Sequence, residues 1–221
     1  MSAHPSVSDN QRTYLPAAGR DWALPLYDPL VRLLGGDAVR ARLLHQAALA
    51  PRVRILDIGC GTGTLAAMIK RQHPDVHVVG LDPDPKALAR AARKAARARA
   101  AIQFDRGFAD ALPYADASFD RVLSSFMFHH LPSDARPNTL REVVRVLAPG
   151  GSFHMVDFAH HHSRRGAMSR MLHSRDRLDE NSEGRVLALM RQAGFAAVRK
   201  ISDGSMLFGQ IQVAYYEACV S

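Results

Sequence analysis

The stretch Leu56-Asp57-Ile58-Gly59-Cys60-Gly61-Thr62-Gly63 decides how this chain folds. Three glycines stand at alternate positions, where the apolar run Val53 to Ile58 gives way to a helical pattern, Thr64 to Gln72. Glycine suits such a turn because the backbone must bend tightly and come close to a bound ligand. The spacing therefore predicts a strand, a ligand-binding turn and a helix in succession.

An acidic residue at the end of the next apolar run supports the same interpretation. Val76 to Leu81 is continuously apolar and is followed by Asp82, a position from which a carboxylate can accept both hydroxyls of a ribose. The glycines could instead serve only a tight turn, but the spacing to Asp82 argues against that alternative. Because Gly-x-Gly-x-Gly replaces Gly-x-Gly-x-x-Gly, a pyrophosphate is disfavoured and a nucleoside is favoured.

Strands and helices alternate along the rest of the chain, which predicts a Rossmann-like, doubly wound α/β sheet of seven strands. Gly194 closes the last expected helix, Ser182 to Ala193, and Gly204 and Gly209 separate the last two strands, which predicts an antiparallel C-terminal hairpin. The expected strands are Val53–Ile58, Val76–Leu81, Ile102–Phe104, Phe119–Ser124, Ser152–Val156, Ala197–Ser202 and Gln210–Cys219. Further helices are expected at Trp22–Leu34, Asp37–Leu49, Lys86–Arg99 and Asn138–Leu147. We expect residues 1–50 to form a helical N-terminal lid and residues 51–221 the main domain.

Composition indicates a folded protein and excludes several classes. Hydrophobic residues make up 47% of the 221 residues and charged residues 23%, which are values for a globular chain. The two cysteines, Cys60 and Cys219, supply neither a disulfide framework nor a cysteine zinc site. Met1 to Pro16 lacks an apolar core, and no run approaches the ~18 apolar residues of a membrane span, so we expect a cytoplasmic protein.

The net charge of +8 comes almost wholly from arginine, with 25 Arg against 4 Lys. One acid-free segment, Lys86 to Phe104, carries six of these cations at helical spacing. A nucleic-acid footprint is one interpretation. We favour the other, a solvated helix face, so nucleic acid is not the expected partner.

Taken together, these motifs resemble the class I S-adenosylmethionine (SAM)-dependent methyltransferases, in particular the group that includes quinone-biosynthesis and small-molecule enzymes. The resemblance covers Arg52 to Phe158 and adds Gly107 to Tyr114, Ser118 to Val122 and Arg145 to Gly151 to the glycine loop. It implies a SAM-dependent enzyme that methylates a small, partly apolar metabolite. Quinone precursors and phospholipid headgroups are alternative acceptors, and a SAM-binding regulatory protein without catalysis is the alternative from another class.

The resemblance also implies the residues that hold SAM. The glycine loop would hold the methionine part, Asp82 the ribose, and Phe108 with Ala109 the adenine. The family often has Asp where Phe108 stands, so Asp110 is expected to supply the polar contact here. The implied SAM-binding set is Asp57, Gly59, Cys60, Gly61, Gly63, Asp82, Pro83, Phe108, Ala109, Asp110, Ser124 and Ser125. Within it, Asp57 could brace the loop rather than touch the ligand, and Cys60 is expected to be an apolar filler.

A general base for the acceptor is expected where strands four and five end. Histidine titrates near neutral pH, and His129 and His130 follow strand four while Asp157 and His160 to His162 follow strand five. The alternative for each histidine is a structural role, and consecutive histidines cannot converge on one metal ion, so no metal is expected. The candidate catalytic residues are His129, His130, His161 and Tyr14, the last of which belongs with Trp22 and Tyr27 to the aromatic residues of the lid.

A long insertion and the absence of other motifs narrow the range of possible methyl acceptors. Phe158 to Asn181 mixes Met and Leu with Arg, which is typical of an amphipathic flap over an apolar acceptor, although peripheral membrane contact is an alternative. Ser124-Ser125-Phe126-Met127 stands where a nucleobase amino-methyltransferase would carry Asn/Asp-Pro-Pro-aromatic. We therefore expect a small organic acceptor.

Overall fold

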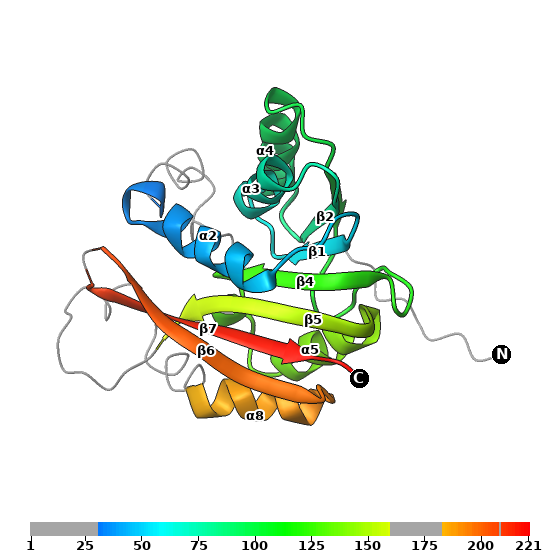
Figure 1. Ribbon diagram of the computed structural model, residues 1–221, viewed down its shortest axis with the longest axis vertical. Helices are drawn as coiled ribbons and strands as arrows, with labels where there is room; N and C mark the ends of the chain where they lie inside the picture. Colours follow the sequence, from blue (N-terminus) through cyan, green and yellow to red (C-terminus); the bar gives the residue numbers. More distant parts are fainter. Residues whose placement is uncertain (1–30, 160–182, 208) are drawn as a thin grey trace.

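The computed structural model describes residues 31–159, 183–207 and 209–221. Seven strands form one sheet in the order β3-β2-β1-β4-β5-β7-β6 (Figure 1). The strands are β1 (Arg54–Ile58), β2 (His77–Asp82), β3 (Gln103–Arg106), β4 (Phe119–Ser125), β5 (Leu147–Phe158), β6 (Ala197–Met206) and β7 (Ile211–Cys219). The first five pair in parallel and the last two are antiparallel, which confirms the predicted doubly wound sheet with a C-terminal hairpin.

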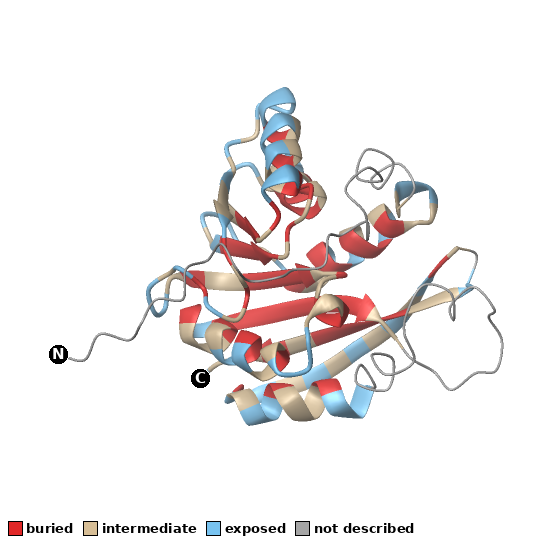
Figure 2. Ribbon diagram, turned by 180° about the vertical axis from the view of Figure 1, so that it is seen from behind, coloured by how far each residue is buried: buried red, intermediate tan, exposed pale blue. Residues whose placement is uncertain are grey.

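Helices cover both faces of the sheet. On one face lie α2 (Gly36–Ala47), α3 (Thr64–Gln72) and α4 (Pro85–Arg97), and on the other α5 (Ala135–Val146) and α8 (Glu183–Ala193), with a short 3-10 turn, Phe128–His130, after β4. Each face has its own apolar core, one built with α2 and α3 and the other with α5 and α8. The central strands are buried along their length, whereas β6 and α8 expose one side (Figure 2).

The strand order reverses between β1 and β4. From β1 the chain winds outward through β2 to β3, and from β4 it winds the other way to β5. Loops at the carboxyl ends of the two central strands therefore diverge, and open α/β sheets bind ligands at such a point. We call the region between the ends of β1 and β4 the crevice. The glycine loop after β1 and the residues after β4 both lie at this crevice.

Local sequence accounts for the element boundaries, with two corrections. The helix expected at Asn138 begins at Ala135, because Pro137 is tolerated in a helix's first turn, where its missing N–H needs no partner. Gly204 does not separate the last two strands but lies within β6, paired with Val213, and the turn forms around Gly209. The Cβ of any other residue at 204 would approach the Tyr215 ring to 3.0 Å, so glycine serves close packing there.

Helix α4 buries one row of alanines and exposes a basic face. Ala87, Ala91 and Ala95 are buried against the sheet, whereas Arg93 and Arg97 are exposed. These two arginines lie on the solvated face predicted from the sequence, whereas Lys94 is half-buried.

Candidate functional site

The glycine loop has a left-handed backbone at all three glycines, with φ of +66° at Gly59, +53° at Gly61 and +72° at Gly63. A Cβ at Gly59 would lie 2.1 Å from Met127 Cγ, and one at Gly63 would lie 2.8 Å from Ala91 Cβ. A Cβ at Gly61 would meet no atom within 4 Å. The outer glycines thus serve close packing, while the central one borders open space that a ligand can use.

Asp82 ties the loop to the end of β2. Its Oδ2 accepts the Gly61 N–H at 2.8 Å, and its Oδ1 accepts the Asp84 N–H at 2.9 Å. Burial raises the pKa of Asp82 to about 6, against the lowering effect of these two hydrogen bonds. Each carboxylate oxygen can accept a second hydrogen bond, so both remain capable of binding a pair of hydroxyls.

A second carboxylate, Asp57, is 1% exposed beneath the loop. Neither of its oxygens makes a well-formed hydrogen bond among the described residues, although the Ala66 N–H lies near enough to lower the Asp57 pKa. Burial raises the pKa of Asp57 to about 7, and the charge of Arg40 opposes this rise. A buried carboxylate with few hydrogen bonds is costly, so a cationic or hydrogen-bond-donating group placed beside Asp57 would stabilise it.

The sequence did not predict Arg40 as a site residue, because nothing in the residue pattern of its helix distinguishes it from the other arginines. It comes from α2 and is 6% exposed, with its guanidinium carbon 5.4 Å from the centre of the Phe126 ring. Phe126 follows β4 with a φ of +58°, a conformation that is strained for an aromatic residue, and its N–H donates to the Val156 carbonyl. Arg40, Phe126 and Asp57 thus meet at the crevice between β1 and β4.

Lys94 braces the loop from the outside. Its Nζ donates to Thr64 Oγ1 at 2.7 Å and lies 3.3 Å from Thr62 Oγ1. Sequence patterning assigned Lys94 to the solvated face of α4, so this contact across the fold was also missed.

His129 and Asp157 form a buried pair on the β4 and β5 side of the crevice. His129 Nδ1 lies 2.6 Å from Asp157 Oδ1, and the His129 backbone N–H donates to Oδ2 at 2.9 Å. Burial tends to raise the pKa of Asp157, but the His129 charge and the hydrogen bonds from His129 and Phe158 bring it below its ordinary value. An ionised carboxylate only accepts, so Nδ1 carries the proton and Nε2 is the basic nitrogen. The ring of His130 lies beside that of His129, with centroids 3.9 Å apart.

The remaining expected SAM-binding residues are distributed around the crevice. Ser124 and Ser125 are the last residues of β4 rather than residues after it, and Ser124 is fully buried opposite Met155. Ala109 is 9% exposed, and Phe108 and Asp110 beside it are half-buried. Pro83 follows Asp82, and its carbonyl accepts from Arg106 Nε. Burial raises the pKa of the Cys60 thiol well above its ordinary value, consistent with an apolar filler rather than a nucleophile.

Several predicted residues lie outside the described part of the chain. These are Tyr14, Trp22 and Tyr27 of the expected lid, His160 to His162, and the expected flap from residue 160 to 181. Phe158, the first residue of that flap, is the last residue of β5. Within the described ranges, no three His, Cys, Asp or Glu side chains converge on a metal position.

Comparison with known proteins points to a methyltransferase domain in the middle of the chain. A family model described as "Methyltransferase domain" matches residues 55–151, from β1 into β5. A demethylmenaquinone methyltransferase of Deinococcus radiodurans is 41% identical over 138 residues, which make up 61% of this chain and 56% of that protein. Residues 55–151 are thus similar to a methyltransferase domain.

Other relatives of this methyltransferase domain act on different molecules. A 27-O-demethylrifamycin SV methyltransferase of Amycolatopsis mediterranei is 39% identical over 119 residues, 53% of this chain and 43% of that protein. The match therefore spans less than two thirds of the length of either relative. Among the described residues, no helix is both long and apolar enough to cross a membrane.

Solved structures share the fold at low sequence identity. Phosphoethanolamine N-methyltransferase 2 of Haemonchus contortus, in complex with SAM, matches with a TM-score of 0.75 and 15% identity, covering 92% of this chain and 58% of that one. The cyclase SpnF matches with a TM-score of 0.69 and 18% identity, covering 83% and 81%. The methyltransferase fold is thus shared by proteins named for different reactions.

The raised pKa of Asp57 predicts that stability falls with rising pH. Between the ordinary value of 3.8 and about 7, the folded protein keeps a proton that the unfolded chain releases, so the free energy of unfolding decreases by up to about 4 kcal/mol across this range. Asp57→Asn, which stays neutral, should remove the part of the decrease that Asp57 contributes and leave the smaller part contributed by Asp82, whose pKa is raised to about 6. Urea unfolding of the ligand-free protein at a series of pH values measures it. Asp75→Asn, at an exposed aspartate, is the matched control, and an unchanged slope in Asp57→Asn would contradict the assignment.

Proposed function

We propose that the protein is a SAM-dependent methyltransferase that acts on a small, partly apolar metabolite. The observation that carries the proposal is the crevice between β1 and β4, where the open space at Gly61 adjoins the buried carboxylates of Asp57 and Asp82. A nucleoside with a cationic amino-acid tail complements this set: Asp82 retains acceptor capacity for ribose hydroxyls, and Asp57 needs a positive or donating partner. The curated relatives named as methyltransferases support the same activity.

SAM supplies, when bound, an electrophilic methyl group on a sulfonium, and transfer of that group depends on alignment and exclusion of water. In this chain the glycine loop and Asp82 would bind the nucleoside side, with Phe108, Ala109 and Asp110 around the adenine. Arg40 would offset part of the charge of Asp57, and a cationic ligand would offset more of it.

His129 would serve as the general base for an acceptor hydroxyl or acidic carbon. The acceptor loses a proton as its new bond to carbon forms, and Nε2 of His129 takes that proton. Asp157 would hold the ring in this tautomer and stabilise the imidazolium that results, as carboxylates do in other His–Asp pairs. His130, His161 and Tyr14 stay candidates for orienting the acceptor.

The names of the relatives suggest several acceptor classes. Quinone precursors are favoured first, because the most similar relatives include a demethylmenaquinone methyltransferase. A phospholipid headgroup is the second candidate, from the structural likeness to phosphoethanolamine N-methyltransferase 2. Nucleic acid is disfavoured as the acceptor because Ser124-Ser125-Phe126-Met127 replaces the nucleobase-methylating motif. A cytoplasmic location belongs to the same proposal.

A SAM-binding protein without methyl transfer is the alternative function, and the likeness to SpnF favours it specifically, since that fold neighbour is named as a cyclase. SAM binding is common to both functions. Release of S-adenosylhomocysteine in the presence of an acceptor is expected only of the methyltransferase and so distinguishes the two.

SAM and S-adenosylhomocysteine should raise the melting temperature, because a ligand that binds only the folded state stabilises it by mass action. Asp82→Ala should weaken that binding by about 1.5 to 3 kcal/mol, the range for charge-assisted hydrogen bonds. Thermal shift over a series of ligand concentrations measures both effects. Asp75→Ala removes an aspartate at the opposite end of β2 and should leave affinity unchanged. Stabilisation by NAD and not by SAM would refute the proposal.

His129→Ala should lower turnover at least about tenfold while SAM affinity stays within about twofold, because a positioned base contributes to the rate and not to SAM binding. A screen of phenols, amines, indoles and quinone precursors for S-adenosylhomocysteine release supplies the acceptor. His77→Ala, at an exposed histidine at the start of β2, is the control. Wild-type rates in His129→Ala would show that proximity alone drives transfer.

A further inference from the structure

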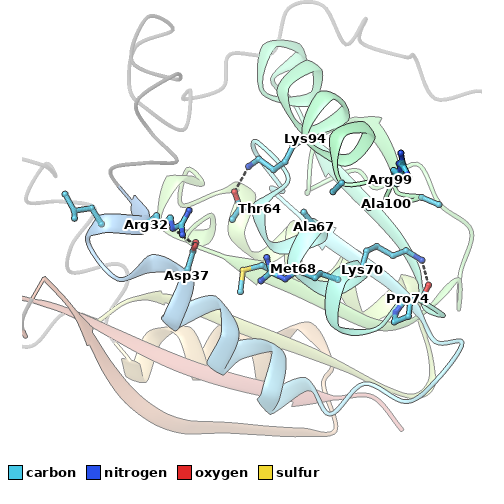
Figure 3. A pocket seen from close by; sticks show the side chains of 14 residues that line it. Arg32, Asp37, Thr64, Ala67, Met68, Lys70, Pro74, Lys94, Arg99 and Ala100 are labelled. Atoms are coloured by element: carbon cyan, nitrogen blue, oxygen red, sulfur yellow. Dashed lines mark hydrogen bonds and ion pairs between the residues drawn. The ribbon is translucent and has the colours of Figure 1, made fainter.

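A second concavity, of about 1130 Å³, lies between α2, α3 and α4 (Figure 3). It follows α3 from its first residue, Thr64, to Pro74 just beyond its end. We call it the α3 groove. Of the residues that line it, Thr64 and Lys94 also take part in bracing the glycine loop, and the others belong to no part of the proposed methyl-transfer site.

Positive charge dominates the rim of the α3 groove. Its lining includes one acid, Asp37, against five cations: Arg32, Lys70, Arg71, Lys94 and Arg99. Helix α4 adds further cations close by, within the acid-free segment from Lys86 to Phe104.

Most of this charge is not neutralised by the described residues. Lys70 Nζ donates to the carbonyls of Pro74 and Val76. These acceptors are neutral, so they satisfy the ammonium group as a hydrogen-bond donor and leave its charge in place. Arg32 meets an acid, with its Nε 3.7 Å from Asp37 Oδ2. Arg71 and Arg99 are exposed and pair with no acid in the described ranges.

The floor of the α3 groove is apolar. Met68 and Ala67 come from α3, and Ala98, Ala100 and Ala101 come from the segment that follows α4. At the mouth Leu33 is 83% exposed, the largest exposure among the large apolar side chains described. A concave apolar floor with a basic rim is complementary to a helix that carries aliphatic side chains on one face and carboxylates beside them.

We propose that the α3 groove binds an acidic amphipathic helix of a partner protein. No aromatic side chain is among the described residues that line it, so it lacks the stacking surfaces on which single-stranded nucleic acid depends. A lipid surface is broad and does not follow a narrow concavity between three helices. The chain's own first thirty residues carry Asp9, Asp21 and Asp28 against Arg12 and Arg20, so they offer little complementary charge.

The test uses the full chain and a fluorescein-labelled helical peptide with leucines on one face and glutamates on both flanks. Fluorescence anisotropy measures its affinity for wild type and for Arg71→Glu/Arg99→Asp. Arg99 has a φ of +51°, and aspartate tolerates that conformation better than most residues. Lys70 and Lys94 stay intact, because Lys70 holds the turn after α3 and Lys94 braces the glycine loop. The control Arg93→Glu/Arg97→Glu makes the same change in net charge on exposed α4 positions outside the groove lining.

The groove variant should bind the peptide at least about tenfold more weakly, as expected when charge-assisted contacts are lost. The control should stay within about threefold of wild type. A peptide with glutamine in place of glutamate should bind wild type as weakly as the acidic peptide binds the groove variant. An unchanged SAM-induced thermal shift in both variants shows that they fold, independently of whether the peptide binds.

Three results would overturn the proposal. If wild type does not bind the acidic peptide, or if both variants lose binding equally, the groove has no specific role. If oligouridine binds more tightly than the peptide and loses affinity in the groove variant, the partner is a nucleic acid. If phosphatidylglycerol vesicles bind in a groove-dependent way and the peptide does not, the groove serves a lipid surface.

Discussion

The hydrogen bond from the Gly61 N–H to Asp82 is the interaction on which the rest of the site depends. It joins the loop after β1 to the end of β2, so the loop is held open toward the crevice rather than collapsed onto the sheet. The backbone is left-handed at three alternate positions, and glycine is the residue that adopts this conformation at low cost. Met127 and Ala91 pack against the loop and leave no volume for side chains at Gly59 or Gly63. Lys94 completes the support from the outer side.

Charge at the crevice follows from the same geometry. Asp57 and Asp82 both lie at the ends of buried strands, where desolvation raises the pKa of each carboxyl. Burying two acids this close together is unfavourable in the absence of cations, and Arg40 supplies part of the compensation. The fold therefore carries a local excess of buried negative character that a cationic ligand such as SAM would relieve. His129 and Asp157, by contrast, are hydrogen-bonded to each other, which suits a group whose proposed role is to move a proton rather than to hold the ligand.

Much of the fold could be predicted from sequence because the relevant signals are local. The helix Thr64 to Gln72 was predicted to the residue, since it follows the last glycine of the loop directly, and alternation of strands and helices predicted the sheet class. The functions of Arg40 and Lys94 could not be predicted, because each contacts a loop distant in sequence and neither lies in a distinctive pattern. The pairing of His129 with Asp157 was within reach, since both residues were named as candidates at neighbouring strand ends, but the hydrogen bond itself depends on the register of β4 against β5. The prediction that Gly204 lies in the turn between the last two strands was wrong, because glycine occurs both in turns and at sites of close packing. Only the register of β6 against β7 distinguishes these two roles.

The central claim is that the crevice between β1 and β4 binds SAM against the carboxylates of Asp57 and Asp82. Calorimetric titration of SAM near pH 6.5, in two buffers with different ionisation enthalpies, tests it most directly, because a cation placed beside a carboxyl that is partly protonated lowers its pKa and releases its proton. We expect saturable SAM binding with a net release of protons, and a smaller release in Asp57→Asn. Absence of SAM binding, or binding with no proton release in the wild-type protein, would contradict it.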